Sequence, residues 1–113
     1  MYIINRSAII VKLKQPYIDW TNSLDASDVY SSEQINKENH IYLIEEYESD
    51  KELEIIIMDF YSEIFKIELS SWVTDETLWP VNRDYKTFKQ WFDIEPHSTV
   101  FDMIDEDIEK EQC

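Results

Sequence analysis

Residues 49–71 read SDKELEIIIMDFYSEIFKIELSS, and this stretch decides the fold. Ser49 and Glu52 match a capping box, in which each side chain accepts a hydrogen bond from the backbone N–H of the other residue. We therefore predict a helix that begins after Ser49 and ends near Ser71. The three consecutive isoleucines have the propensity of a strand, but the cap and the length of the stretch favour a helix.

Apolar residues cover roughly 220° of this helix, whereas a helix on a protein surface needs an apolar stripe of only about 100°. Glu54 and Glu68 interrupt the apolar arc. Two explanations stay open: the helix lies centrally, between a sheet and another helix, or part of the arc contacts a second copy of the protein. The polar side spans about 60° and consists of Glu52, Asp59, Glu63, Lys66 and Ser70.

Three strands are predicted around this helix. Residues 7–14 place apolar side chains on alternate positions, as a strand with one buried face does. Residues 40–47 contain a continuous apolar run from Ile41 to Ile44, which indicates a strand that is buried on both faces. Residues 97–104 form the last predicted strand, because Pro96 ends the element before it.

Two shorter helices are predicted at 16–24 and 84–93, from apolar residues that recur at helical spacing. The order β-α-β-α-α-β indicates an α+β (or small α/β) fold, in which helices pack over a three-stranded sheet. The connections between strands are long enough for neighbouring strands to be parallel. We predict a single globular domain over residues 1–104 and a frayed acidic tail over residues 105–113.

Composition excludes several classes of function. The 113 residues include no glycine, so the glycine-dependent phosphate loops and the nucleophile elbow of acyl transferases are absent. There are 25 acidic and 10 basic residues, a formal net charge of −15, which disfavours binding to nucleic acid or to an anionic membrane. Left-handed turns, where the chain needs them, are expected at asparagines such as Asn5, Asn36 and Asn82.

The sequence also bears on redox chemistry and location. Cys113 is the only cysteine, so there is neither an intramolecular disulfide nor a cysteine-based zinc site. We expect a cytoplasmic protein, because the chain has no recognisable leader and no apolar run long enough to span a membrane.

His40 and His97 are the candidate metal ligands. Each stands directly before a predicted strand, and neighbouring parallel strands would bring both rings to the same edge of the sheet. With Asp102 or another carboxylate they would form a site with two histidines and one carboxylate. Histidines at strand ends are common, however, so a purely structural role is the competing interpretation.

The aromatic region between the last two helices is the candidate binding surface. Tryptophan and tyrosine are enriched at interfaces, and they are also ordinary core residues. The candidate residues are Trp72, Asp75, Glu76, Trp79, Arg83, Tyr85 and Trp91.

Several segments together resemble a family of small acidic bacterial proteins of unknown function. These segments are residues 14–20 (KQPYIDW), 42–44 (YLI), 74–80 (TDETLWP), 91–94 (WFDI) and 97–102 (HSTVFD). The resemblance implies a bacterial, cytoplasmic protein, and it implies no activity, cofactor or functional residue.

The leading hypothesis is a non-enzymatic protein-binding or regulatory domain without a cofactor. Its unidentified partner is basic if it binds the acidic surface, and a homodimer is also open. The first alternative is a small enzyme or metal-binding protein that uses His97, His40 and nearby carboxylates. The second is a mimic of nucleic acid that occupies the basic groove of another protein.

Overall fold

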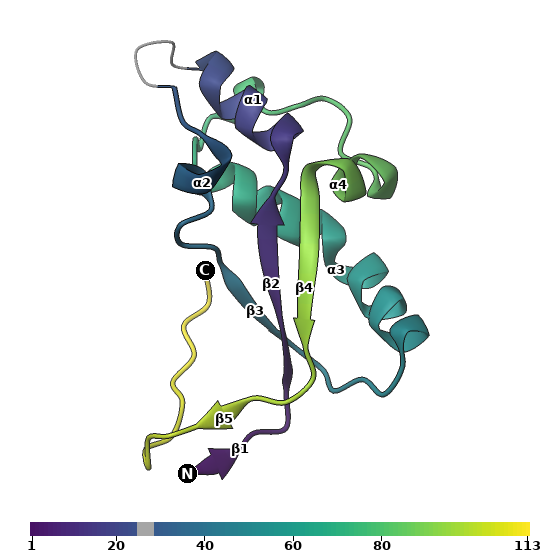
Figure 1. The fold of residues 1–113 in the computed structure, drawn as a ribbon, viewed down its shortest axis with the longest axis vertical. Helices are drawn as coiled ribbons and strands as arrows, with labels where there is room; N and C mark the ends of the chain where they lie inside the picture. Colours follow the sequence, from purple (N-terminus) through teal and green to yellow (C-terminus); the bar gives the residue numbers. More distant parts are fainter. Residues whose placement is uncertain (25–28) are drawn as a thin grey trace.

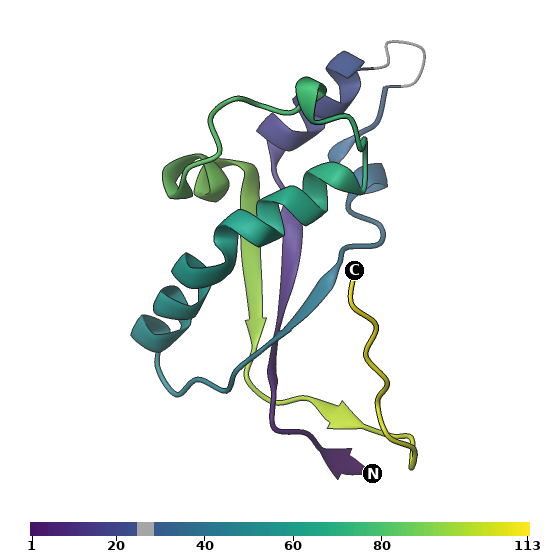
Figure 2. The same ribbon diagram turned by 180° about the vertical axis from the view of Figure 1, so that it is seen from behind.

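One face of a three-stranded sheet packs against a long helix in the computed structural model, which describes residues 1–24 and 29–113. Figure 1 shows the sheet in front of this helix, and Figure 2 shows the same arrangement from behind. β2 (Ser7–Leu13) is the central strand, with β3 (Ile41–Ile44) and β4 (Phe92–His97) on its two sides.

Five helical segments and a small ribbon complete the described chain. β1 (Tyr2–Ile3) and β5 (Phe101–Asp102) pair with each other and extend beyond one end of the sheet. The fold is therefore a mixture of helices with a two-stranded and a three-stranded sheet, as an α+β prediction requires. The helical segments are α1 (Gln15–Leu24), α2 (Ser32–Ile35), α3 (Asp50–Ser70), the 3-10 helix η1 (Glu76–Leu78) and α4 (Tyr85–Trp91).

The expectation of neighbouring parallel strands is wrong. Both β3 and β4 run antiparallel to β2, which separates them, with Ile9 opposite Tyr42 on one side and Pro96 on the other. The reason is visible in Figure 1: α1, α2 and α4 gather at the end of the sheet where β2 finishes. The chain leaves these helices at that end, so the next strand runs back beside β2.

The predicted long helix is confirmed as α3, with a modified cap. The Ser49 hydroxyl accepts a hydrogen bond from the backbone N–H of Glu52 (3.1 Å). The Glu52 carboxylate, however, accepts from the backbone N–H of Glu48 (2.8 Å) rather than from that of Ser49. The carboxylate thus still satisfies a free N–H beside the positive end of the helix.

Aromatic rings fill the core between α3, α4 and the sheet. Phe65 of α3 is fully buried, and its ring meets that of Phe92 of β4 edge to face, with 5.1 Å between ring centroids. Phe88 of α4 lies 5.0 Å from Phe92. On β2, Ile9 and Val11 face this cluster and are also fully buried.

The wide apolar arc of α3 is only partly covered within the chain. Residues that face the sheet and α4 are buried, among them Ile57, Ile64 and Leu69. Phe60 and Ile67 remain 41% and 42% exposed. The central-helix explanation therefore accounts for part of the arc and leaves an apolar side of α3 open.

Three predicted boundaries are wrong at the C-terminal end of the domain. α4 ends at Trp91 instead of residue 93, because Phe92 already has extended backbone angles (φ −132°, ψ 145°). The strand predicted at 97–104 is replaced by β4 at 92–97 and by the two residues of β5. Pro96 does not stop β4, since a proline fits an edge strand where no N–H is needed.

The second strand is shorter than predicted and is not buried on both faces. β3 comprises four residues, and Ile41 and Leu43 are 66% and 49% exposed. They lie on the face of the sheet opposite α3, and among the described residues no helix covers that face (Figure 1). The expected left-handed turns are also missing, because no described residue has a positive φ.

Candidate functional site

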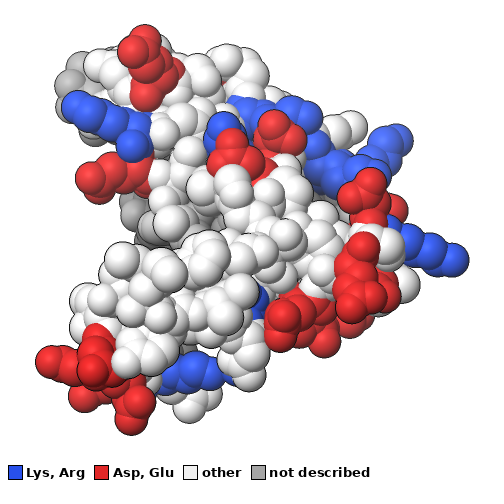
Figure 3. All heavy atoms as spheres, turned by 60° about the horizontal axis from the view of Figure 1, so that its bottom comes forward, with Lys and Arg blue, Asp and Glu red and all other residues white. Residues whose placement is uncertain are grey.

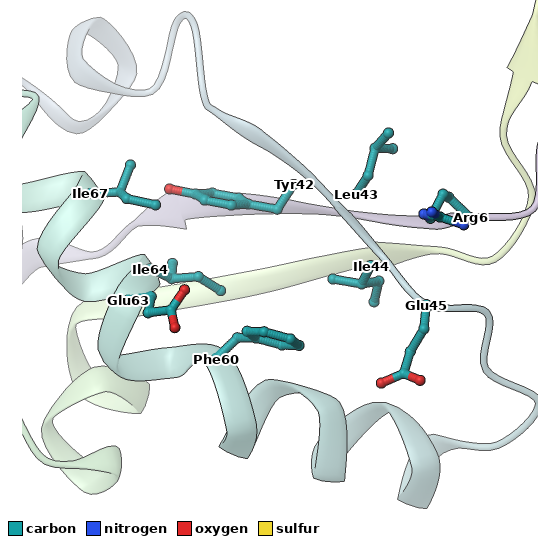
Figure 4. A pocket seen from close by; sticks show the side chains of 9 residues that line it. All are labelled: Arg6, Tyr42, Leu43, Ile44, Glu45, Phe60, Glu63, Ile64 and Ile67. Carbon is teal, nitrogen blue, oxygen red and sulfur yellow. The ribbon is translucent and has the colours of Figure 1, made fainter. Parts of the chain in front are cut away.

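An apolar groove of about 570 Å³ runs between α3 and the edge of β3. Figure 4 shows that Phe60 and Ile64 of α3 and Ile44 of β3 point into this space from opposite sides. The groove extends toward Ile67, which lies one helical turn beyond Ile64. The complete lining is Arg6, Tyr42, Leu43, Ile44, Glu45, Phe60, Glu63, Ile64 and Ile67.

The free edge of β3 carries unpaired backbone groups. The backbone N–H of Val11 donates to the carbonyl of His40 (3.3 Å), so His40 points its backbone toward β2. Because hydrogen bonding alternates along an antiparallel pair, the N–H and C=O of Ile41 and Leu43 point away from β2. Within the described residues β3 pairs with β2 alone, so these groups form a free edge beside the groove.

The other edge of the sheet, on β4, is blocked. The backbone N–H of Lys14 donates to the carbonyl of Trp91 (2.8 Å). By the same alternation, Phe92, Ile94 and Pro96 direct their backbone away from β2. Pro96 has no N–H to donate, and prolines of this kind protect edge strands from pairing. The two edges of the sheet therefore differ, and only that of β3 is open to a further strand.

Charges around the groove are mostly negative. Glu45 and Glu63 line it, and Arg6 is its one basic residue. The guanidinium of Arg6 donates to the backbone carbonyl of Asn5 (2.8 Å). Figure 3 shows the acidic residues of one face in separate groups, with an uncharged area between them.

A buried carboxylate, Glu68, lies next to the groove near the end of α3. Its side chain is 4% exposed. The ring nitrogen Nδ1 of His40 lies 2.8 Å from Glu68 Oε2, and the hydroxyl of Tyr42 donates to the same oxygen. The hydroxyls of Tyr17 (2.6 Å) and Ser71 (2.8 Å) both donate to the backbone carbonyl of Glu68.

This polar cluster changes the acidity of both tyrosines. Burial raises the pKa of Tyr42 above its usual value, and the hydrogen bond to Glu68 raises it further. Burial also raises the pKa of Tyr17, with a second contribution from the negative charge of Glu68. Both hydroxyls therefore stay protonated in the folded protein at neutral pH and act as hydrogen-bond donors.

A second, smaller cavity of about 200 Å³ is lined in part by Glu68. The amide oxygen of Asn39, another lining residue, is buried and has no hydrogen-bond partner among the described residues. Trp72 also lines this cavity, together with Leu13, Tyr17, Ile35, Glu38, His40 and Ser71.

The structure separates His40 and His97. His40 precedes β3, at the end of the sheet near the helices, and pairs with Glu68. His97 ends β4, at the opposite end of the sheet, and lies 3.1 Å from Glu95. Asp102 lies in β5, where its carboxylate accepts from the backbone N–H of Ile104. Within residues 1–24 and 29–113, no three His, Cys, Asp or Glu side chains come together to hold a metal ion.

The predicted aromatic surface is divided between several roles. Trp79 is buried, and its ring N–H donates to the carbonyl of Val73 (2.8 Å). Arg83 lies over the Trp79 ring at 5.7 Å, and Asp75 accepts from the backbone N–H of Thr77 at the start of η1. These contacts stabilise the loop around η1.

The other members of that surface lie elsewhere. Tyr85 and Trp91 are half-buried and pack on the rings of the core, while Glu76 is exposed in η1. Trp72 is the one member that lines a cavity with Glu68.

The residues that assemble at β3 and α3 were not predicted from the sequence. Tyr17, Tyr42 and Glu68 are far apart along the chain, so no local motif predicts their contact. The one signal was Glu68 itself, an acidic residue within the apolar arc of the long helix. A carboxylate on a buried helix face requires partners, because an unpaired buried charge is costly.

None of the described helices combines the length and the hydropathy required to cross a membrane. Comparison with family models, with curated proteins and with solved structures found no match to the chain.

Proposed function

We propose that the protein is a binding domain that captures an extended segment of another protein along the free edge of β3. The observation that carries the proposal is the difference between the two edges of the sheet. β3 offers the N–H and C=O of Ile41 and Leu43 beside an apolar groove, whereas Pro96 blocks β4. Extended peptides bind in this way by adding a strand to an open sheet edge.

The groove defines the chemistry of the bound segment. In a strand, alternate side chains point to the same face, so every second residue of the segment would enter the groove between β3 and α3. Phe60, Ile64 and Ile67 favour apolar side chains at those positions. Glu45 and Glu63 favour Lys or Arg at the intervening or flanking positions, and the net charge of −15 attracts such a segment from a distance.

Charge argues for a different protein as the partner rather than a second copy. Two molecules that each carry −15 repel one another at low salt, although two β3 edges could pair in principle. Light scattering at low and high salt tests this point. A dimer of the wild type that is lost in the Leu43→Pro variant would show that the β3 edge binds a second copy of this chain rather than a different protein.

The other two hypotheses have less support. His40 and His97 pair with separate carboxylates at opposite ends of the sheet. A mimic of nucleic acid needs rows of carboxylates, and the face in Figure 3 has separate groups. A cytoplasmic location and the bacterial family resemblance stay predictions.

A strand-forming probe tests the proposal directly. We expect a capped peptide of alternating valine and lysine to shift the NMR signals of Ile41, Leu43 and Phe60, and to slow amide exchange at Ile41 and Leu43. A peptide of alternating valine and glutamate should bind more weakly. Signals that shift only around β4 or α4 would contradict the proposal, as would unchanged exchange at saturation.

Two variants at one position supply the matched control. Leu43→Pro removes one outward N–H and leaves the β2–β3 hydrogen bonds in place, so peptide binding should be lost. Leu43→Val keeps the N–H and the strand propensity, so binding should persist. Equal binding by the folded proline variant would rule out strand addition at this edge.

A further inference from the structure

The cavity beside Glu68 lies where the end of α3 meets the beginning of β3, and two of its lining residues are carboxylates. Glu68 Oε2 already receives the hydrogen bonds from His40 and Tyr42. Among the described residues, no side chain donates to Glu68 Oε1. The Asn39 amide oxygen also lacks a partner, but it is fully buried and does not open onto the cavity. Glu38 adds a second carboxylate to the lining, which contains neither Lys nor Arg.

The buried charge of Glu68 lacks a permanent positive partner. His40 is its single ion-pair partner among the described residues, and His40 carries a charge only when it is protonated. A buried carboxylate is costly unless it is paired and hydrogen-bonded. An additional cation in the cavity would supply that pairing.

The remaining walls indicate what kind of cation fits. Trp72, which is 37% exposed, adds an aromatic side chain to the lining, and aromatic rings attract organic cations. Leu13 and Ile35 offer apolar contact for methylene groups. The cavity of about 200 Å³ is below the range of pockets for drug-sized ligands, so the ligand is small. A metal ion fits less well, because no described group of three His, Cys, Asp or Glu side chains could hold one.

We propose that this cavity binds a primary ammonium group carried on a short alkyl chain. The ammonium donates to Glu68 Oε1, and the alkyl chain lies against Leu13 and Ile35. Such a group belongs either to a free alkylamine or to the side chain of a lysine in a partner protein. This inference does not rest on strand addition at β3, because a small amine needs no strand.

Titration with n-butylamine, followed by NMR, tests the inference. At neutral pH the amine is protonated, and we expect saturable shifts at the indole N–H of Trp72, at Ser71 and at Asn39. So small a ligand binds with a dissociation constant in the millimolar range. Butanol, which has the same shape without the charge, should leave these signals unchanged. Equal shifts with butanol, or no saturation with butylamine, would overturn the proposal.

A pair of charge-neutralising variants on one helix sharpens the test. Glu68→Gln should weaken butylamine binding by about tenfold or more, since it removes a buried charged acceptor. Asp59→Asn neutralises an exposed carboxylate on the polar side of the same helix, which lines neither the groove nor the cavity, and should leave the affinity unchanged. Equal affinities of wild type and a folded Glu68→Gln variant would contradict the inference. If Glu68→Gln does not fold, the contrast between butylamine and butanol in the wild type still decides.

A lysine analogue distinguishes the two sources of the ammonium group. Nα-acetyl-lysine N-methylamide carries the same alkylammonium with a peptide backbone attached. Affinity equal to that of butylamine supports a partner lysine, and a much weaker affinity supports a free amine. The peptide probe of the β3 edge is measured separately, so failure of strand addition would not be mistaken for failure of this site.

Discussion

Glu68 connects the two sites at the scale of single residues. Its carboxylate accepts a hydrogen bond from the hydroxyl of Tyr42, a residue that also lines the groove. Its backbone carbonyl accepts a hydrogen bond from the hydroxyl of Tyr17. Hydrogen bonds that satisfy a buried carboxylate fix the position of every group that makes them. The beginning of β3 and the end of α3 are therefore held together by polar contacts as well as by apolar packing.

The stability of the protein at alkaline pH depends on the ionisation of Tyr17 and Tyr42. Because the pKa of both Tyr17 and Tyr42 is raised by folding, ionisation favours the unfolded chain. Their contribution to the free energy of unfolding is complete below pH about 10 and is lost as the pH rises above that value. We expect the urea midpoint of the wild type to fall steeply in this range.

Tyr17→Phe removes the hydroxyl and keeps the aromatic ring, so it isolates the contribution of the hydroxyl to stability. At neutral pH the variant should lose about 1 kcal/mol of unfolding free energy, the usual value of one hydrogen bond, because the Glu68 carbonyl keeps its bond from Ser71. Above pH about 10 it should lose less stability than the wild type, since phenylalanine cannot ionise. Parallel curves of urea midpoint against pH would contradict the assignment.

At the scale of elements, α3 is specified by its first residues. The Ser49 hydroxyl binds the N–H of Glu52, and the Glu52 carboxylate binds the N–H of Glu48. These bonds satisfy backbone donors that the helix itself leaves free. The end of the helix is held by tertiary hydrogen bonds of Glu68 with Tyr17 and Tyr42, and by a local one from the Ser71 hydroxyl to the Glu68 carbonyl.

Replacement of the capping serine, and of a second serine within α3, tests the cap. Ser49→Ala should lower the free energy of unfolding by about 1 kcal/mol, because it leaves an N–H of the first turn unbound. Ser62→Ala, an exposed position in the middle of the same helix, should be neutral or slightly stabilising, since alanine is the better helix former. Equal effects of the two substitutions in urea denaturation would show that the cap contributes nothing.

At the scale of the whole molecule, one aromatic core joins the sheet, α3 and α4. Phe65 is fully buried within it, whereas Phe60, on the same helix, is 41% exposed in the groove. We therefore expect Phe65 to contribute mainly to the stability of the fold and Phe60 mainly to binding in the groove.

Alanine at each position tests that separation. Phe65→Ala should cost about 3–5 kcal/mol of unfolding free energy, a large share of the roughly 5–15 kcal/mol of a typical domain. Phe60→Ala should cost far less unfolding free energy and should lower the affinity for the peptide probe. Urea denaturation gives the stabilities, and a cost for Phe60→Ala as large as that for Phe65→Ala would contradict the assigned core.

The net charge of −15 acts on the molecule as a whole. Repulsion among the acidic residues opposes the compact state, and salt screens it, because the Debye length falls from about 30 Å at 0.01 M to about 8 Å at 0.15 M. We expect the urea midpoint to rise over this range, equally in NaCl and KCl. A midpoint that falls with salt would mean that favourable ion pairs outweigh repulsion.

The sequence by itself determined the features that depend on local interactions. The cap at Ser49 and the apolar spacing of residues 53–69 specify α3, because a helix is stabilised by contacts within a few residues. Alternation over residues 7–14 specified β2, and the lack of glycine in the sequence means that the glycine-dependent phosphate loops and the nucleophile elbow are absent. The mixed α+β class follows from these elements together.

Only the tertiary structure decided which groups meet. The antiparallel directions, the open edge of β3 and the blocked edge of β4 depend on where the connecting helices pack, at the end of the sheet where β2 finishes. The contact of His40 with Glu68 joins residues 28 positions apart, and that of Tyr17 with Glu68 joins residues 51 positions apart. Local propensity carries no information about such contacts, because their free energy exists only once the core has brought the elements together.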